Sequence, residues 1–221
     1  MDLSIALACI GAGISFYGVL QYVNGILHHG TKPRMASWVA WLTANSIFTI
    51  IALQESAWLA AAINGAGVLA NALIVGMSMR KKVPMKPVDG IDWACLVISV
   101  ACVTLILVLP ENKVAVALLA MAANLIATTP TFRHAWAKPR EETWQLFAAN
   151  AVANGLGTAG VVLVSGLEFV AMAGPLVSTL GNVALVSITL GRGWLTAVEK
   201  EIERDVQLVE EELAVVETKT E

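Results

Sequence analysis

The chain has 221 residues, of which 57% are hydrophobic and only 14% are charged, and its mean hydropathy is +0.71. Because a soluble domain carries about 25% charged residues, this composition excludes an ordinary soluble protein and predicts an integral membrane protein. The net charge of −3 reflects an acidic C-terminal segment, and the sequence lacks the clustered basic face that binds nucleic acid.

Seven apolar runs follow one another, each long enough or nearly long enough for the roughly twenty residues of a membrane-crossing helix. Only Met1 and Asp2 precede the first run, so we expect it to be a retained helix rather than a cleaved signal peptide. The runs are Leu3–Leu27, Ala36–Leu53, Trp58–Met79, Ile91–Leu109, Val114–Thr129, Trp144–Val164 and Phe169–Leu190.

The connections between the runs are charged on one side only. Those after the first, third, fifth and seventh runs are basic, whereas Lys113 is the single cation of the alternate connections. Positive loops stay in the cytoplasm, which predicts a multi-pass protein of the cell membrane with its N-terminus outside and its C-terminus inside. The cations of the cytoplasmic side would be Lys32, Arg34, Arg80, Lys81, Lys82, Lys86, Arg133, Lys138, Arg140 and Arg192.

A tripeptide that occurs twice predicts an internal repeat. Lys32-Pro33-Arg34 is followed by Trp38, and Lys138-Pro139-Arg140, at an offset of 106 residues, is followed by Trp144. Runs one to three and runs five to seven then form two parallel three-helix units, with the fourth run as a linker. The expected divisions are residues 1–83, 84–112 and 113–191, followed by a cytosolic segment over 192–221.

The last segment has the pattern of an amphipathic helix. Leu195, Ile202, Val209 and Val216 fall seven residues apart among acidic side chains. Two interpretations stay open: a solvated tail, or a coiled-coil helix through which residues 195–221 bind a second copy or a partner protein.

Asparagines and aromatic residues, rather than charges, interrupt the apolar runs. An amide in hydrocarbon costs several kcal/mol unless it is paired, so we expect these residues to face the bundle interior or a wet cavity. There they either contact a solute or hold helices together, although Trp38 and Trp144 are more typical of an interfacial belt. The sets that share one helix face are Tyr17, Gln21 and Asn24; Trp38, Trp41, Asn45 and Phe48; Asn64 and Asn71; and Trp144, Phe147, Ala151 and Asn154, with Asn150 beside the last set.

No pattern of an enzyme or a metal site is present in the sequence. His28, His29 and His134 have no cysteine or carboxylate at the spacing of metal ligands. We therefore expect no catalysis, no metal and no cofactor. Because no charged residue falls inside a run beyond its ends, an uncharged polar solute moving down its gradient is favoured over proton or voltage coupling.

Three motifs resemble those of the superfamily that contains the SWEET and SemiSWEET sugar transporters, the PQ-loop proteins and the nicotinamide riboside transporters. Pro130-Thr131-Phe132, followed by Lys138 and Glu141-Glu142, is similar to a SWEET motif. Ile63-Asn64-Gly65-Ala66-Gly67 is similar to a second, whose Asn contacts sugar, and Trp38-x-x-Trp41-x-x-x-Asn45 resembles a motif of the nicotinamide riboside transporters. Asn24 stands where that superfamily has a proline, and Gly174 replaces a second sugar-contacting Asn.

The resemblance implies an all-α membrane protein of seven helices in a 3+1+3 arrangement. It also implies facilitated diffusion of a small uncharged polar solute by alternating access, with sugar favoured and a nicotinamide riboside or other nucleoside-like solute as the alternative. A third possibility is a non-transporting receptor or scaffold that acts through residues 195–221.

Two groups of candidate residues follow from the sequence. Amides would bind solute hydroxyls and aromatic rings would stack on the solute. Prolines at the cytoplasmic ends would either end helices or act as hinges. The solute-binding candidates are Asn64, Asn45, Trp41, Phe48, Asn150, Asn154 and Phe147. The gating candidates are Asn24, Pro33, Pro130 and Pro139.

Overall fold

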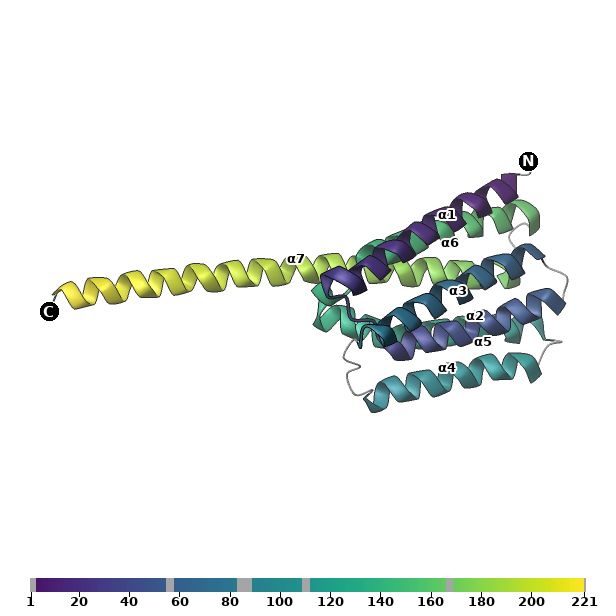
Figure 1. Cartoon of the computed structure of the whole chain (residues 1–221), viewed down its shortest axis with the longest axis horizontal. Helices are drawn as coiled ribbons and strands as arrows, with labels where there is room; N and C mark the ends of the chain where they lie inside the picture. The colour runs from purple at the N-terminus through teal and green to yellow at the C-terminus, as the bar shows by residue number, and fades with distance from the viewer. Residues whose placement is uncertain (1–2, 55–57, 83–88, 109–111, 166–168, 221) are drawn as a thin grey trace.

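A computed structural model of the chain describes residues 3–54, 58–82, 89–108, 112–165 and 169–220. The regular structure of this part is entirely helical, so the predicted all-α class is confirmed (Figure 1). The α-helices are α1 (Leu3–Asn24), α2 (Met35–Gln54), α3 (Trp58–Arg80), α4 (Gly90–Val108), α5 (Lys113–Ala137), α6 (Trp144–Ser165) and α7 (Phe169–Thr220). A π-helical turn, η1 (Gly25–His29), extends α1, and a 3-10 turn, η2 (Pro139–Glu141), follows α5.

Each apolar run forms the body of one helix, and α5 and α7 continue beyond the ends of their runs. Within the described residues, four helical stretches are long and apolar enough to cross a membrane, as expected of a membrane-embedded protein. They are Leu3–His29, Val114–Ala137, Trp144–Val164 and Gly174–Leu208, and Gly90–Ile106 is a shorter apolar helix.

The C-terminal end of α5 differs from the prediction. The helix continues through Pro130 to Ala137 instead of ending at Thr129, so termination at Pro130 is wrong. Pro130 is buried, and the Thr128 and Thr129 hydroxyls donate to carbonyls one turn back, at 2.7 and 3.1 Å, which keeps this region hydrogen-bonded. The helix does end ahead of Pro139, which takes the first position of η2.

Small residues spaced by seven allow α1 to pack closely along α6. Ser4, Gly11, Gly18 and Gly25 lie on one face of α1 and its π-helical extension. A Cβ built on Gly18 would lie 2.6 Å from the Cβ of Ala149, and one built on Gly11 would lie 3.1 Å from the carbonyl oxygen of Ala153. Glycine is therefore required on this face, as in other close helix contacts in membranes.

The helix contacts have a regular pattern. α3 packs against both α1 and α2, and α7 packs against both α5 and α6. α1 packs extensively against α6, and α2 packs against α5. α4 contacts α5 and α2 (Figure 1).

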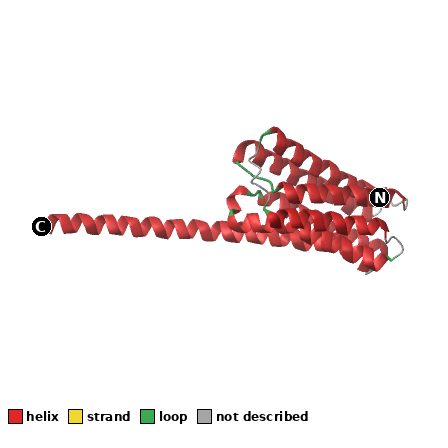
Figure 2. Cartoon of the chain, turned by 90° about the horizontal axis from the view of Figure 1, so that it is seen from below, coloured by secondary structure: helices red, strands yellow, loops and turns green. Residues whose placement is uncertain are grey.

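α7 is a single helix of 52 residues, about 78 Å long at 1.5 Å per residue. Gly191 and Gly193 do not interrupt it, so the segment expected over 192–221 is the continuation of the last bundle helix rather than a separate one. Its C-terminal part projects beyond the other helices (Figures 1 and 2). Apolar side chains on its described part, including Leu195, Ile202 and Val206, are exposed.

One end of the bundle gathers the loops with the repeated tripeptide. The Lys32 backbone N–H donates to the carbonyl of Glu141, and η2 contacts α7 close to Gly193. This end, formed by residues 25–34, residues 138–143 and the outgoing part of α7, is called the basic end below.

Candidate functional site

The two Lys-Pro-Arg loops meet at the basic end through Glu141. The Lys32 ammonium lies 2.6 Å from Glu141 Oε1, and the Lys138 ammonium lies 3.3 Å from the same oxygen. Burial alone would raise the pKa of Glu141, but the hydrogen bonds from Lys32 and Lys138 outweigh it and lower the pKa. Glu141 therefore stays anionic and bridges two lysines that hold the same position in the two copies.

A second contact joins the same loops beside the end of α1. The Thr31 and Thr143 hydroxyl oxygens lie 2.6 Å apart and share a hydrogen bond. Gly25 sits directly under this pair, and the chain turns there because Gly30 has a φ of +75°, a left-handed conformation that favours glycine. Thr31, Lys32, Glu141, Glu142 and Thr143, together with Tyr22, are called the loop junction below.

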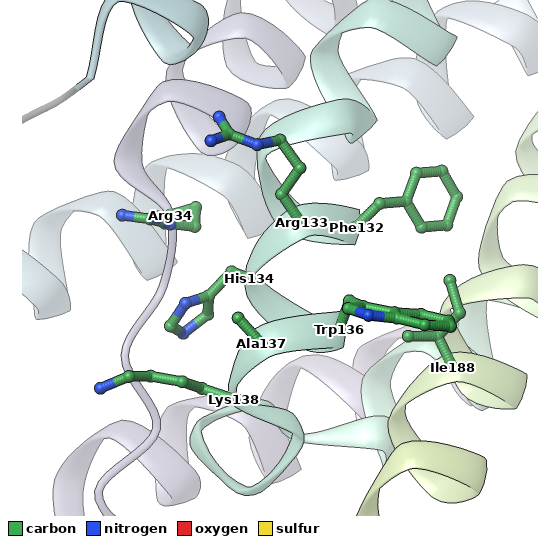
Figure 3. A pocket seen from close by; sticks show the side chains of 8 residues that line it. All are labelled: Arg34, Phe132, Arg133, His134, Trp136, Ala137, Lys138 and Ile188. Atoms are coloured by element: carbon green, nitrogen blue, oxygen red, sulfur yellow. The ribbon is translucent and has the colours of Figure 1, made fainter.

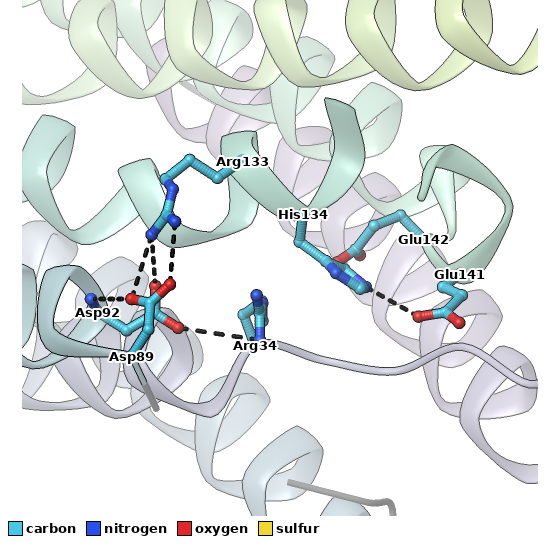
Figure 4. Close-up of polar contacts among 7 residues, drawn as sticks. All are labelled: Arg34, Asp89, Asp92, Arg133, His134, Glu141 and Glu142. Carbon is cyan, nitrogen blue, oxygen red and sulfur yellow. Dashed lines mark hydrogen bonds and ion pairs between the residues drawn. The ribbon is translucent and has the colours of Figure 1, made fainter. Parts of the chain in front are cut away.

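The Glu142 side chain is fully buried in the loop junction. It is 0% exposed, and its Oε2 accepts a hydrogen bond of 3.0 Å from the hydroxyl of Tyr22, which is also 0% exposed. His134 Nε2 lies 3.9 Å from Glu142 Oε1 and 3.4 Å from Glu141 Oε2 (Figure 4). Burial raises the pKa of Glu142 from 4.5 to about 8, although the Tyr22 hydrogen bond and the Arg34 charge oppose this.

Aromatic rings enclose the Tyr22 side chain. Its ring centroid lies 5.0 Å from that of Trp38 and 6.2 Å from that of Phe147, and Trp38 in turn contacts Trp41 edge-on at 5.0 Å. Trp38 is only 3% exposed, so its assignment to an interfacial belt is wrong, whereas Trp144 is 39% exposed. The apolar walls exclude water from the Tyr22–Glu142 contact.

A separate ion-pair cluster fixes the start of α2 to α4 and α5. Arg34 lies 3.8 Å from Asp92, and Arg133 lies 2.9 Å from Asp89 and 3.4 Å from Asp92 (Figure 4). The hydrogen bond from Arg133 lowers the pKa of Asp89 to about 2. Asp89 also accepts the Asp92 N–H at 2.9 Å, which satisfies a free donor at the start of α4.

Two of the four predicted solute-binding asparagines, Asn150 and Asn45, contact a neighbouring helix. The Asn150 amide oxygen accepts a bond of 2.8 Å from the Ser15 hydroxyl of α1, and the Asn154 amide donates to the Asn150 carbonyl at 2.8 Å. Asn45 lies against Gly67 of α3, where an added Cβ would approach its amide nitrogen to 3.0 Å. The contacts of Asn150 and Asn45 match the helix-joining alternative, whereas the Asn154 bond lies within α6.

Asn64 differs from Asn150 and Asn154, whose side chains are hydrogen-bonded. It is partly buried on α3, and its side chain makes no hydrogen bond to any residue in the described part of the chain. Phe48 and Trp41 on α2 are also partly buried, whereas Phe147 is 1% exposed and committed to the core. The structure thus pairs Trp41 with Trp38, and Phe147 with Tyr22, whereas the side-chain amides of Asn64 and Asn45 make no hydrogen bond to the described residues.

Two of the gating candidates lie in the loops of the basic end, and the other two lie in helices. Pro33 and Pro139 are buried in the loops of the basic end, and Pro130 lies within α5. Asn24 is exposed at the end of α1, and Tyr17 is 58% exposed. The expectation that the face with Tyr17 and Asn24 points into the bundle is therefore wrong; Tyr22 is the inward residue.

An open cleft of about 660 Å³ lies at the surface beside His134 (Figure 3). Cationic side chains line one part and apolar side chains another, and the Arg192 guanidinium lies 5.1 Å from the Trp136 ring centroid. None of the predicted solute-binding or gating residues lines this cleft. Its lining residues are Arg34, Phe132, Arg133, His134, Trp136, Ala137, Lys138 and Ile188.

Sequence reasoning missed Tyr22, His134, Glu142 and Asp92 as site residues. The available signal was Glu141-Glu142, an acidic pair inside an otherwise basic connection. The spacing argument placed His134 away from carboxylates, but the turn after α5 brings two of them close to it. Among the described residues, no group of three His, Cys, Asp or Glu is arranged to hold a metal ion.

Comparison of the chain with family models, with curated proteins and with solved structures gives no match in any of the three.

Proposed function

We propose that the protein is a multi-pass membrane transporter that carries a small uncharged polar solute, with sugar favoured, by alternating access. The observation that carries this proposal is the loop junction. Two copies of one loop, from opposite halves of the chain, are drawn together at one end of a bundle of apolar helices by an ion pair, a hydroxyl pair and a buried hydrogen bond.

The helix contacts support a 3+1+3 arrangement of two parallel units. In two repeated units, α1, α2 and α3 correspond to α5, α6 and α7. The α1–α6 contact then corresponds to the α5–α2 contact, and the contacts of α3 with α1 and α2 correspond to those of α7 with α5 and α6. Both pairs are present. α4, which has no counterpart, would be the linker between residues 1–83 and residues 113–191.

The loop junction has the properties of a reversible gate. Each neutral hydrogen bond contributes only about 0.5–1.5 kcal/mol net, and an exposed ion pair contributes about 0–1 kcal/mol. A few such contacts hold the basic end closed, yet solute binding can shift the equilibrium. Separation of the two loops would open this end by a relative movement of the two units.

Asn64 is the favoured solute ligand because the sugar-transporter motif falls on it and its amide makes no hydrogen bond to the described residues, whereas Asn45 also packs against Gly67. An amide offers both donors and acceptors to solute hydroxyls, and the partly buried ring of Trp41 offers a stacking surface. Trp41 keeps a nicotinamide riboside or other nucleoside-like solute as the alternative to sugar. The positive-inside rule would place the basic end in the cytoplasm of the cell membrane.

A specific observation favours a second candidate function. The projecting part of α7 leaves the bundle as a continuous helix with exposed Leu195, Ile202 and Val206. A non-transporting scaffold or receptor would use this segment to bind a partner or a second copy. The two candidates differ in whether a solute binds the bundle.

Solute binding and flux test the proposal. The purified protein is heated with hexoses, disaccharides, nucleosides or nicotinamide riboside, and uptake of any stabilising solute is measured in proteoliposomes. A solute that binds the folded state raises the melting temperature, and we expect Asn64→Ala to weaken its binding by about 2- to 12-fold, the loss of one hydrogen bond.

The matched control is Asn182→Ala, because the Asn182 amide donates to the Ser178 carbonyl of its own helix at 2.8 Å. This variant should bind the same solute as the parent. Binding lost equally in both variants would remove Asn64 from the site, and the absence of both stabilisation and flux across the panel would favour the scaffold.

A further inference from the structure

Glu142 is a buried acid that the solute site does not use. We infer that Glu142 is a proton-binding site of the closed loop junction, which takes up one proton when the basic end closes and releases it when the basic end opens. This inference deepens the proposed function: if the protein transports a solute, the transport cycle includes a protonation step.

The geometry around Glu142 favours its neutral form. The side chain is fully buried, and one hydrogen bond, from Tyr22, reaches its Oε2. Among the described residues its Oε1 accepts no hydrogen bond, and His134 Nε2 lies 3.9 Å away, beyond hydrogen-bond distance but close enough for an ion pair when His134 is protonated. A buried carboxylate needs several donors or a close cation to stay ionised, and this carboxyl group has one neutral donor.

The charged and titratable groups around Glu142 come from four segments: α1, the first loop, η2 and α5. Tyr22 of α1 is a neutral donor, and Arg34 of the first loop, whose charge acts on Glu142, lies 3.8 Å from Asp92 and is shared with that acid. Glu141 is anionic and disfavours a second negative charge nearby. His134 of α5 is the other group that can bind a proton near neutral pH.

Opening of the junction would reverse this environment. If the two loops separate, water reaches Glu142 and its pKa returns toward 4.5 from about 8 in the closed junction. Between these values the closed state holds one more proton than the open state. A rise in pH across this range therefore weakens closure by up to tenfold per pH unit, and the dependence disappears below and above it.

The distance between the two loops tests this directly. Cys9, Cys95 and Cys102 are replaced by Ser, and spin labels are attached to His29→Cys and Arg140→Cys, two exposed positions in the two loops. Distances are recorded in lipid nanodiscs between pH 4.5 and pH 9. We expect the long-distance population to grow relative to the short one by up to tenfold per pH unit up to about pH 8.

Three variants assign the proton. Glu142→Gln keeps the shape of the protonated acid and should remove the pH dependence, whereas Glu141→Gln, its neighbour, and His134→Gln should retain it. A pH dependence that persists in Glu142→Gln, or that is lost only in His134→Gln, overturns the assignment to Glu142.

The melting temperature reads the same proton when the closed state predominates at every pH. Unfolding also exposes Glu142, so the parent should lose stability relative to Glu142→Gln as pH rises from 5 to 8. Glu141→Gln keeps Glu142, so its stability should not diverge from that of the parent in this way. The inference is overturned if the distance distribution does not change with pH and the difference in melting temperature between the parent and Glu142→Gln is the same at every pH.

Neither readout requires a solute. A flat pH response in a protein with measurable flux therefore refutes proton binding and leaves the proposed transporter intact. A clear pH response in a protein with no flux supports proton binding by Glu142 and counts against the proposed transporter.

Discussion

At the scale of single residues, the hydrogen bond between Tyr22 and Glu142 connects parts of the chain that are 120 residues apart. Both side chains are 0% exposed, so neither can exchange its partner for water. A buried polar group without a partner costs about 1–3 kcal/mol. Loss of the Tyr22 donor would therefore cost more than the net strength of one hydrogen bond, because it would leave a buried oxygen of Glu142 without that partner.

Tyr22→Phe should lower the stability of the folded protein by about 1–3 kcal/mol, because it removes the donor to a buried carboxyl group and keeps the ring. The measurement is thermal or denaturant unfolding in detergent at pH 6. Tyr17→Phe is the control, since Tyr17 is 58% exposed, and it should change stability by less than about 0.5 kcal/mol. Equal melting temperatures for the two variants would contradict the buried hydrogen bond.

The sequence contains the residues of the loop junction but not their environment. Glu141 and Glu142 are neighbours in one loop, yet Glu141 is paired with two lysines and Glu142 is buried against α1. Local sequence describes both as solvated loop acids, because burial is decided by Tyr22 from the other half of the chain. The asparagines show the converse, since helix spacing located Asn150 correctly on a face but did not reveal its Ser15 partner.

At the scale of elements, the α1–α6 contact depends on the absence of side chains. Gly18 touches α6, whereas a Cβ on Gly13, five residues earlier on the same helix, would meet nothing within 4 Å. The two glycines therefore separate the effect of helix propensity from the effect of packing.

Gly18→Ala should destabilise the protein by about 1–3 kcal/mol, because the new methyl group overlaps Ala149 and forces the helices apart. Gly13→Ala should stabilise it by about 0.5–1 kcal/mol, because alanine is the better helix former. Both are measured by unfolding in the same detergent. A gain of stability in Gly18→Ala would show that α1 and α6 are farther apart than described here.

The positions of the helices could be predicted because a membrane helix must be apolar along its length. Their ends could not always be predicted, because packing decides them. Pro130 lacks an N–H, but it lies within α5 beside Thr131, which is 0% exposed, and the helix continues past it. Gly191 and Gly193 weaken a helix only slightly, and α7 runs through both.

Removal of residues 199–221 separates the two candidate functions. The described side chains at 199–208 are exposed, so their loss removes little packing, and the melting temperature and any solute flux should stay unchanged. A scaffold that works through this helix would instead lose its partner or its oligomeric state, which size-exclusion chromatography with light scattering would detect. A large fall in melting temperature would show that the segment packs on the bundle.

At the scale of the whole molecule, the distribution of charge and the fold both distinguish one end of the bundle from the other. The basic end gathers the Lys-Pro-Arg loops and the projecting part of α7, whereas α5 begins at the opposite end beside Asn112, which is exposed. A chain whose helices cross a bilayer in succession must keep these two ends on different sides. The positive-inside rule is the basis for proposing that the basic end lies in the cytoplasm.

Labelling of single cysteines in a cysteine-free background tests this orientation. Lys82 and Arg204 are exposed, on the α3–α4 connection and on the projecting part of α7 respectively. Cysteines at these two positions should react with a membrane-impermeant maleimide only after the cells are permeabilised, whereas Asn112→Cys should react in intact cells. Loss of the Asn112 side chain removes the cap on Ala115 and costs about 1 kcal/mol, which a membrane helix tolerates.

Labelling of Asn112→Cys and Lys82→Cys from the same side would refute the proposed crossing of the membrane, and with it the parallel orientation of the two units. The reverse labelling pattern would keep the crossings but place the loop junction outside the cell, where the Glu142 proton would come from the external medium.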